Sequence, residues 1–147
     1  MANSYTQILV HTTFHVKGDN RIDAFDKPAL YRYITGIINA LSSETIAIGG
    51  TSNHIHILFS LPKTISLSEF IMKIKANSSR WLKDQGTQYR AFAWQDGYGA
   101  FSVSASVVAK LKDYINNQEE HHRKVSYKEE VKRFFDAYHI DYDERYI

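Results

Sequence analysis

Two histidines two positions apart, His54 and His56, are the first residues whose types and spacing suit chemistry. Successive side chains of a β-strand point to opposite faces, so a strand here would place both imidazoles on one face and Ile55 on the other. Neutral imidazole nitrogens are common metal ligands, and such a pair can hold one ion. The alternative is a half-exposed strand face that carries two histidines and no ion. A metal site needs a third ligand, which the neighbouring residues do not supply.

A second pair, Tyr114 and Gln118, lies in a segment with helical spacing of its apolar residues, from about residue 106 to 122. Residues four apart share a helix face, so the phenol and the amide would lie one turn from each other. A free tyrosine has a pKa near 10 and needs activation before it can attack as a phenolate. The alternative is ordinary packing for the tyrosine and a solvated surface position for the glutamine.

Hydrophobic periodicity predicts the elements that must position these side chains. The spacing predicts strands at 6–16, 45–48, 54–61, 91–94 and 100–103, and helices from residue 27 to about 41, 66 to about 83, 106 to 122 and 126 to 138. This order matches a ferredoxin-like split βαβ arrangement, an α+β fold with an antiparallel sheet, helices on one face and additional C-terminal helices. We expect one domain over residues 1–147, with about 123–147 as a C-terminal helical extension.

Composition excludes several classes of site. The chain has 147 residues and no cysteine, which removes disulfides, thiolate zinc sites, iron–sulfur clusters and cysteine nucleophiles. It has no apolar run of the roughly 20 residues that a membrane helix needs, and its first residues do not resemble a signal peptide. We therefore expect a cytoplasmic protein with no membrane partner and no nucleotide cofactor.

Charge is distributed unevenly along the chain. The net charge of +2 is small, but residues 63–90 hold six basic and two acidic residues, whereas residues 119–147 hold six basic and eight acidic residues. A basic middle beside an acidic end indicates an anionic partner that meets one face of the protein.

Four fragments in order carry a family resemblance over about residues 5 to 122. They are Asn53-His54-Ile55-His56-Ile57-Leu58, Lys73-x-Lys75 with Ser78-Ser79-Arg80, Trp94-x-x-Gly97-Tyr98, and Tyr114-Ile115-x-x-Gln118. Together they resemble the single-tyrosine HUH transposases (histidine, hydrophobic, histidine). This group comprises the TnpA-type enzymes of small bacterial insertion sequences and the REP-associated tyrosine transposases.

The resemblance implies a specific chemistry. Tyr114 would attack a DNA phosphodiester to give a 5′-phosphotyrosine link and a free 3′-hydroxyl. His54, His56 and Gln118 would bind one divalent ion, Mg²⁺ or Mn²⁺. The substrate would be single-stranded DNA with a hairpin, and the protein would be a homodimer in which one subunit's tyrosine helix can complete the other's site. Tyr127 is the rival nucleophile, although it has less family support.

The resemblance also assigns a partner to the basic segment. Phosphate contacts give affinity without sequence information, and the candidates are four residues of the helix from 66 to 83, namely Lys73, Lys75, Arg80 and Lys83. Two other functions stay open: a domesticated module that binds DNA hairpins without mobilising them, and a small histidine-based metallo-hydrolase. The hydrolase predicts a carboxylate as third ligand and an activity that survives Tyr114→Phe.

Overall fold

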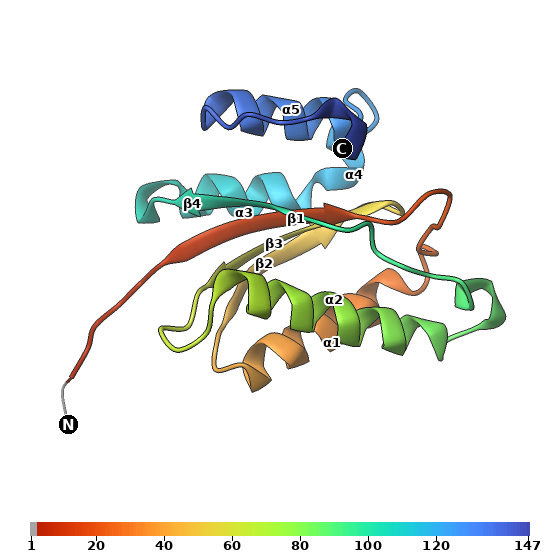
Figure 1. The fold of residues 1–147 in the computed structure, drawn as a ribbon, viewed down its shortest axis with the longest axis horizontal. Coiled ribbons are helices and arrows are strands. Elements are labelled where there is room, and N and C mark those ends of the chain that lie inside the picture. Colours follow the sequence, from red (N-terminus) through yellow and green to blue (C-terminus); the bar gives the residue numbers. More distant parts are fainter. Residues whose placement is uncertain (1–2) are drawn as a thin grey trace.

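The computed structural model describes residues 3–147 and has an antiparallel sheet with helices on both faces (Figure 1). The strands are β1 (Leu9–His15), β2 (Thr45–Gly50), β3 (His54–Ser60) and β4 (Gly99–Val103). The α-helices are α1 (Lys27–Ala40), α2 (Leu67–Lys83), α3 (Val108–Asn116), α4 (Gln118–His121) and α5 (Tyr127–Ala137). Three 3-10 turns, at Thr87–Tyr89, Ala105–Val107 and Glu144–Tyr146, complete the described elements.

The strand order β2-β3-β1-β4 is that of the expected ferredoxin-like sheet. All three pairings are antiparallel, and β3 and β1 lie in the middle. Their register sets Thr13 opposite His56 and His15 opposite His54. Because central strands are fixed by hydrogen bonds on both sides, the two histidines predicted to act together are held by the most constrained part of the sheet.

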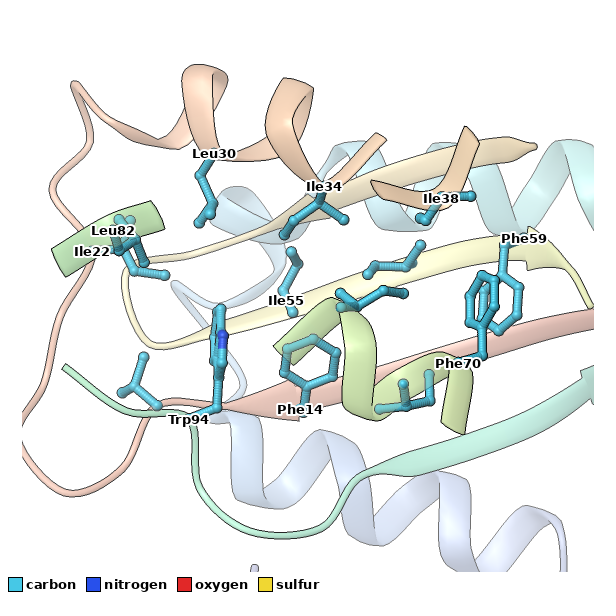
Figure 2. Close-up of a cluster of buried hydrophobic side chains, with 14 of the residues drawn as sticks. Phe14, Ile22, Leu30, Ile34, Ile38, Ile55, Phe59, Phe70, Leu82 and Trp94 are labelled. Atoms are coloured by element: carbon cyan, nitrogen blue, oxygen red, sulfur yellow. The ribbon is translucent and has the colours of Figure 1, made fainter. Parts of the chain in front are cut away.

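The larger apolar core lies on the sheet face that α1 and α2 cover (Figures 1 and 2). Alternation along β3 sends Ile55, Ile57 and Phe59 into this core, as period two predicts. Phe59 stacks on Phe70 of α2, with ring centroids 4.4 Å apart. Ser66 caps α2 through its hydroxyl, which accepts a hydrogen bond from the Glu69 amide at 3.2 Å.

The C-terminal helices α3, α4 and α5 lie on the opposite face (Figure 1). A smaller apolar cluster of Ala47, Leu58 and Ile115 fastens α3 to this face, beside the outward side chains of β3. Gly49 of β2 permits the approach, because a Cβ atom there would lie 2.3 Å from the carbonyl oxygen of Ile115. A glycine thus brings α3 close to the histidine pair.

Two predicted elements are wrong in extent. The strand expected at 91–94 is only one isolated bridge, between Val16 and Trp94. The helix expected from 106 to 122 is broken at Asn117, which separates α3 from α4. The Asn117 side-chain amide donates to the carbonyl oxygen of Asp113 at 2.8 Å, the kind of local bond that competes with a continuous helix.

Within residues 3–147, none of the helices has the length and apolar character needed to cross a bilayer.

Candidate active site

The two histidines of β3 lie side by side beneath the C-terminal helices. His54 is 1% exposed and His56 is fully buried, and their ring centroids are 5.2 Å apart. Both project from the sheet face opposite the core that holds Ile55, as the alternation predicted. Buried imidazoles need defined partners on both nitrogens, and these partners determine which nitrogen can bind an ion.

The partners of His54 leave its Nε2 atom without a hydrogen. Asn53 Oδ1 accepts from the Thr51 hydroxyl at 2.9 Å and lies 2.7 Å from His54 Nδ1, so Nδ1 is the atom that donates. Burial lowers the pKa of His54 to about 3, with a smaller contribution from nearby His56, so the ring is neutral. Its Nε2 atom therefore presents a lone pair to Gln118 Oε1, another lone-pair atom, at 2.9 Å. Two facing lone pairs are stabilised by a cation that both can bind.

His56 is oriented by a third histidine on the neighbouring strand. His11 of β1 places its Nε2 atom 2.7 Å from His56 Nδ1, and the two rings stack with centroids 5.0 Å apart. Burial lowers the pKa of His11 to about 3, so this ring is neutral too. A contact of this kind fixes the ring of a metal-binding histidine and leaves its other nitrogen directed at the site.

The break in the predicted third helix lies directly before Gln118, whose side chain reaches the histidine cluster. Gln118 begins α4, is 1% exposed, and directs Oε1 at His54 and also at His122, whose Nε2 atom lies 3.0 Å away. Its amide nitrogen lies 3.3 Å from the Tyr114 carbonyl oxygen and 3.3 Å from Glu130 Oε2. The structure therefore brings Gln118 to the histidine cluster, with the oxygen of its amide facing His54 and His122.

Two groups that the sequence analysis did not assign, the Glu130 carboxylate and the His122 imidazole, complete the cluster. Glu130 of α5 is 2% exposed, and its Oε1 atom lies 2.7 Å from His56 Nε2. Its Oε2 atom lies 3.2 Å from His122 Nε2 and 3.1 Å from His121 Nε2. Burial raises the pKa of Glu130, but its contacts with His56 and the hydrogen bond from Tyr114 outweigh this, so its pKa is below the ordinary value. The carboxylate is ionised at the centre of the site.

A signal for both residues was present in the sequence. Glu130 lies one helical turn before Phe134 on the buried side of an amphipathic helix, where a charged residue is rarely found without a partner. His122 lies four residues after Gln118, which sets the two on one face of a turn.

The donor atoms lie close enough together that they could hold one divalent ion after a small contraction. Those of His54, His56, His122 and Glu130 all lie within 4.8 Å of one another. Ligand bonds of about 2.0–2.2 Å put adjacent donors about 3 Å apart and opposite donors about 4 Å apart. The imidazoles fit Mn²⁺ and its first-row neighbours, and the carboxylate and amide oxygens fit Mg²⁺ as well.

Tyr114 of α3 reaches the same cluster. Its hydroxyl donates to Glu130 Oε2 and lies 3.4 Å from His121 Nε2. Burial raises the pKa of Tyr114, and the hydrogen bond to Glu130 and the charge of that carboxylate raise it further. The phenol therefore keeps its proton in this arrangement, held at the oxygen of a carboxylate that also faces the metal donors.

The rival tyrosine lies differently. The Tyr127 ring packs against His54, with centroids 4.5 Å apart, while its hydroxyl accepts from Thr13 at 3.2 Å on β1. Burial raises the pKa of Tyr127. Its hydroxyl thus points to the Thr13 side chain of β1, whereas that of Tyr114 points to Glu130.

The four basic residues of α2 lie across the sheet from the cluster (Figure 1). Lys75 is tied to the loop before β4, because its ammonium donates to the carbonyl oxygens of Gln95 and Gly97, both at 2.7 Å. Lys73 lies 4.0 Å from Glu69, and Arg80 lies 3.5 Å from the side-chain oxygen of Asn77. The structure does not bring these residues, or Lys83, to the histidine face.

Comparison with known proteins places the chain. Residues 4–118 match the model of the family described as "Transposase IS200 like". A candidate transposase from Deinococcus radiodurans R1 has the same fold at 18% identity, with a TM-score of 0.60, 80% of this chain and 96% of that chain covered. A REP-associated tyrosine transposase, solved bound to a REP hairpin, is 15% identical with a TM-score of 0.60, 85% of this chain and 74% of that chain being covered. No curated protein matches. Because the family model spans most of the chain, this protein belongs to the IS200-like transposase family.

Proposed function

We propose that this protein is a metal-dependent transposase that cleaves and rejoins single-stranded DNA at hairpin-marked ends, with Tyr114 as the nucleophile. One observation carries the proposal: the Tyr114 hydroxyl and the His56 imidazole contact the same buried carboxylate, so a nucleophile and a set of metal donors converge. A likeness in fold to a REP-associated transposase bound to a hairpin supports the choice of substrate.

The reaction exchanges one phosphodiester for another. The Tyr114 oxygen attacks phosphorus and forms a new ester bond, the bond from phosphorus to the 3′-oxygen breaks, and that oxygen takes up a proton. The result is a 5′-phosphotyrosine and a free 3′-hydroxyl. The energy of the broken bond is retained, so attack by a 3′-hydroxyl reverses the step and rejoins strands without ATP.

Residues of this chain accept the proton of the nucleophile and orient the metal ligands for that step. Glu130 Oε2 accepts the hydrogen bond from Tyr114 and is the atom positioned to take its proton. A divalent ion held by His54, His56 and Gln118 would supply positive charge that polarises the phosphate and favours the phenolate. His11 and Asn53 hold the imidazoles of His56 and His54 in one orientation, so the donors need little rearrangement.

Access to the tyrosine is provided on one side of the cluster. A cavity of about 270 Å³ between α3 and α5 is lined by Tyr114, Phe134 and Tyr138, with Lys110 also at its edge. A phosphodiester that entered here would meet the tyrosine ring and the Lys110 cation. We further propose that exposed cations of α2, such as Lys83, contact phosphates elsewhere on the DNA, and that the protein acts as a homodimer.

A metallo-hydrolase is the second candidate, because the carboxylate ligand that this alternative requires is present as Glu130. The two candidates differ in what Tyr114 does. A hydrolase activates water and does not need the phenol, whereas the transposase forms a covalent link through it.

The test is a cleavage assay on an end-labelled single-stranded hairpin with Mn²⁺ or Mg²⁺. Wild-type protein should give a protein–DNA adduct that survives denaturation, Tyr114→Phe should give none, and Tyr127→Phe should still give it. An adduct lost only with Tyr127→Phe would move the nucleophile. If DNA is cleaved without an adduct, and this cleavage persists in Tyr114→Phe, the protein is a hydrolase. If the hairpin is bound but not cleaved, the protein is a binding module.

A further inference from the structure

The segment that follows the family match contributes directly to the metal donors. The match ends at residue 118, yet His122 and Glu130 lie within the group of four ligand residues. His122 follows α4, and Glu130 belongs to α5, which the chain folds back over the sheet (Figure 1). The histidines of β3 and the ligands of the C-terminal segment thus meet only when this segment is docked.

Aromatic contacts define how α5 docks. Phe134 stacks on Phe101 of β4 with centroids 5.0 Å apart, and it meets His11 edge-on at 5.1 Å. The Tyr138 hydroxyl donates to the Ser102 carbonyl oxygen at 2.8 Å. These contacts lie one to two turns beyond Glu130, and they direct its carboxylate into the space above His56.

The carboxylate adds what the other donors lack. His54, His56 and Gln118 are neutral ligands, so an ion bound by these three alone would gain no charge neutralisation from the protein. Glu130 Oε1 lies 2.7 Å from His56 Nε2 and 3.9 Å from His54 Nε2, and is 2% exposed. Burying an unpaired carboxylate costs free energy, so Glu130 needs a positively charged partner. Because little water screens the charge in the buried site, the electrostatic attraction between the carboxylate and a divalent ion is stronger there than at the surface.

We propose that His122 and Glu130 complete the metal centre of this chain, so that ion binding and docking of the C-terminal segment are one coupled event. Coupling is reciprocal: if docking creates two ligands, the bound ion must in turn hold α5 in place. When undocking releases the ion, an ion concentration of 100 times its Kd slows the exposure of α5 about 100-fold. This inference concerns ion binding and does not require that the chain transfer DNA strands.

The test uses the full chain with Mn²⁺ as the probe and no DNA. Mn²⁺ affinity is measured by electron paramagnetic resonance titration, and the exposure of α5 by hydrogen exchange of its amides with and without the ion. Glu130→Gln keeps the shape of the side chain and removes its charge, and it should weaken Mn²⁺ binding at least about 100-fold, at or beyond the upper end of the loss seen for outer-shell changes. It should also abolish the ion-dependent protection of α5 while leaving the amides of α1 unchanged.

Glu129→Gln is the matched control, since the neighbouring carboxylate is exposed and outside the cluster; it should bind Mn²⁺ like the wild type. His122→Gln provides the second variant should Glu130→Gln fail to fold, with an expected loss of about 10-fold or more. Wild-type Mn²⁺ affinity in the folded variants would overturn the proposal, as would faster exchange of α5 when Mn²⁺ binds. A failure of the DNA cleavage assay leaves these measurements unaffected, so the two hypotheses fail separately.

Discussion

Replacing Gly49 by alanine tests whether the close approach of α3 positions the nucleophile. Gly49 pairs with His56 across β2 and β3, and α3 passes directly over it. A Cβ atom at this position would lie 2.3 Å from the Ile115 carbonyl oxygen and 3.1 Å from its carbonyl carbon. Both are backbone atoms, so no side-chain rotation relieves the overlap, and α3 or β2 must move.

The size of the movement follows from the contact. The Cβ to oxygen distance must lengthen by 0.7 Å to reach 3.0 Å, and by 1.1 Å to reach ordinary contact at 3.4 Å. Tyr114 precedes Ile115, so its hydroxyl moves with the helix by about the same amount. A misplacement of about 1 Å at a reacting group costs on the order of 100-fold in rate. Inserting a methyl group into packed structure costs about 1–3 kcal/mol of folding free energy.

The assay is the single-turnover rate of adduct formation, together with urea unfolding and Mn²⁺ affinity of the same preparations. For Gly49→Ala we expect an adduct rate about 100-fold lower and a stability about 1–3 kcal/mol lower. Mn²⁺ affinity should fall less than the rate, because the donors of His54 and His56 belong to β3 and not to α3 or the segment that follows it. This last readout needs no DNA substrate.

Gly36→Ala is the matched control. Gly36 is exposed in α1, and nothing lies within 4 Å of the position its Cβ would take. Alanine is the better helix former, so this variant should be about 0.5–1 kcal/mol more stable and should form adduct at the wild-type rate. If Gly49→Ala kept both wild-type stability and wild-type rate, the reasoning that the glycine sets the position of α3 would be refuted.

Three further outcomes are expected. Burial lowers the pKa of His11 and of His54 from 6.5 to about 3, so on acidification the unfolded chain binds these protons before the folded chain does, and stability falls as pH drops below 6.5. In EDTA, urea unfolding should show a loss of about 2 kcal/mol for each histidine between pH 8 and pH 5. A stability that does not change over this range would contradict the prediction. Lys75→Met should cost about 1–3 kcal/mol because two carbonyl oxygens lose their donor, whereas Lys83→Met should change stability by less than about 0.5 kcal/mol; equal effects would show that Lys75 is not an anchor. Ser126→Ala removes the hydroxyl that caps α5 and should destabilise that helix by about 1 kcal/mol, seen as faster amide exchange in α5 than in α1.

Local patterns were sufficient for the four strands of the sheet and for the histidine pair, although they also predicted a strand at 91–94 that is only an isolated bridge. Alternation along residues 54–60 depends only on the geometry of a strand, so it correctly separated His54 and His56 from Ile55. The capping of α2 by Ser66 was also predictable, because a cap is a contact over three residues. Both features are determined within a few residues of the chain.

Features that depend on contacts distant in the sequence were not predictable in this way. The periodicity of residues 106–122 is helical throughout, and only the Asn117 side chain and the packing of Gln118 against His54 reveal the break. Glu130 lies 74 residues from His56, and its burial follows from the docking of α5 rather than from its own surroundings in the sequence. A pattern shows that a position is buried, but it does not name the partner.

The division of the site between sheet and helices has a mechanistic consequence. His54 and His56 are held by hydrogen-bonded strands and by neighbours within the same sheet, so their donor atoms form a fixed base for an ion. Tyr114, Gln118 and Glu130 stand on helices that pack on that base from the other side, and their positions relative to the histidines change whenever a helix moves. Substitutions under α3 should therefore reduce strand transfer more than ion binding, whereas substitutions in α5 should reduce both, because Glu130 faces the ion donors and the nucleophile at once.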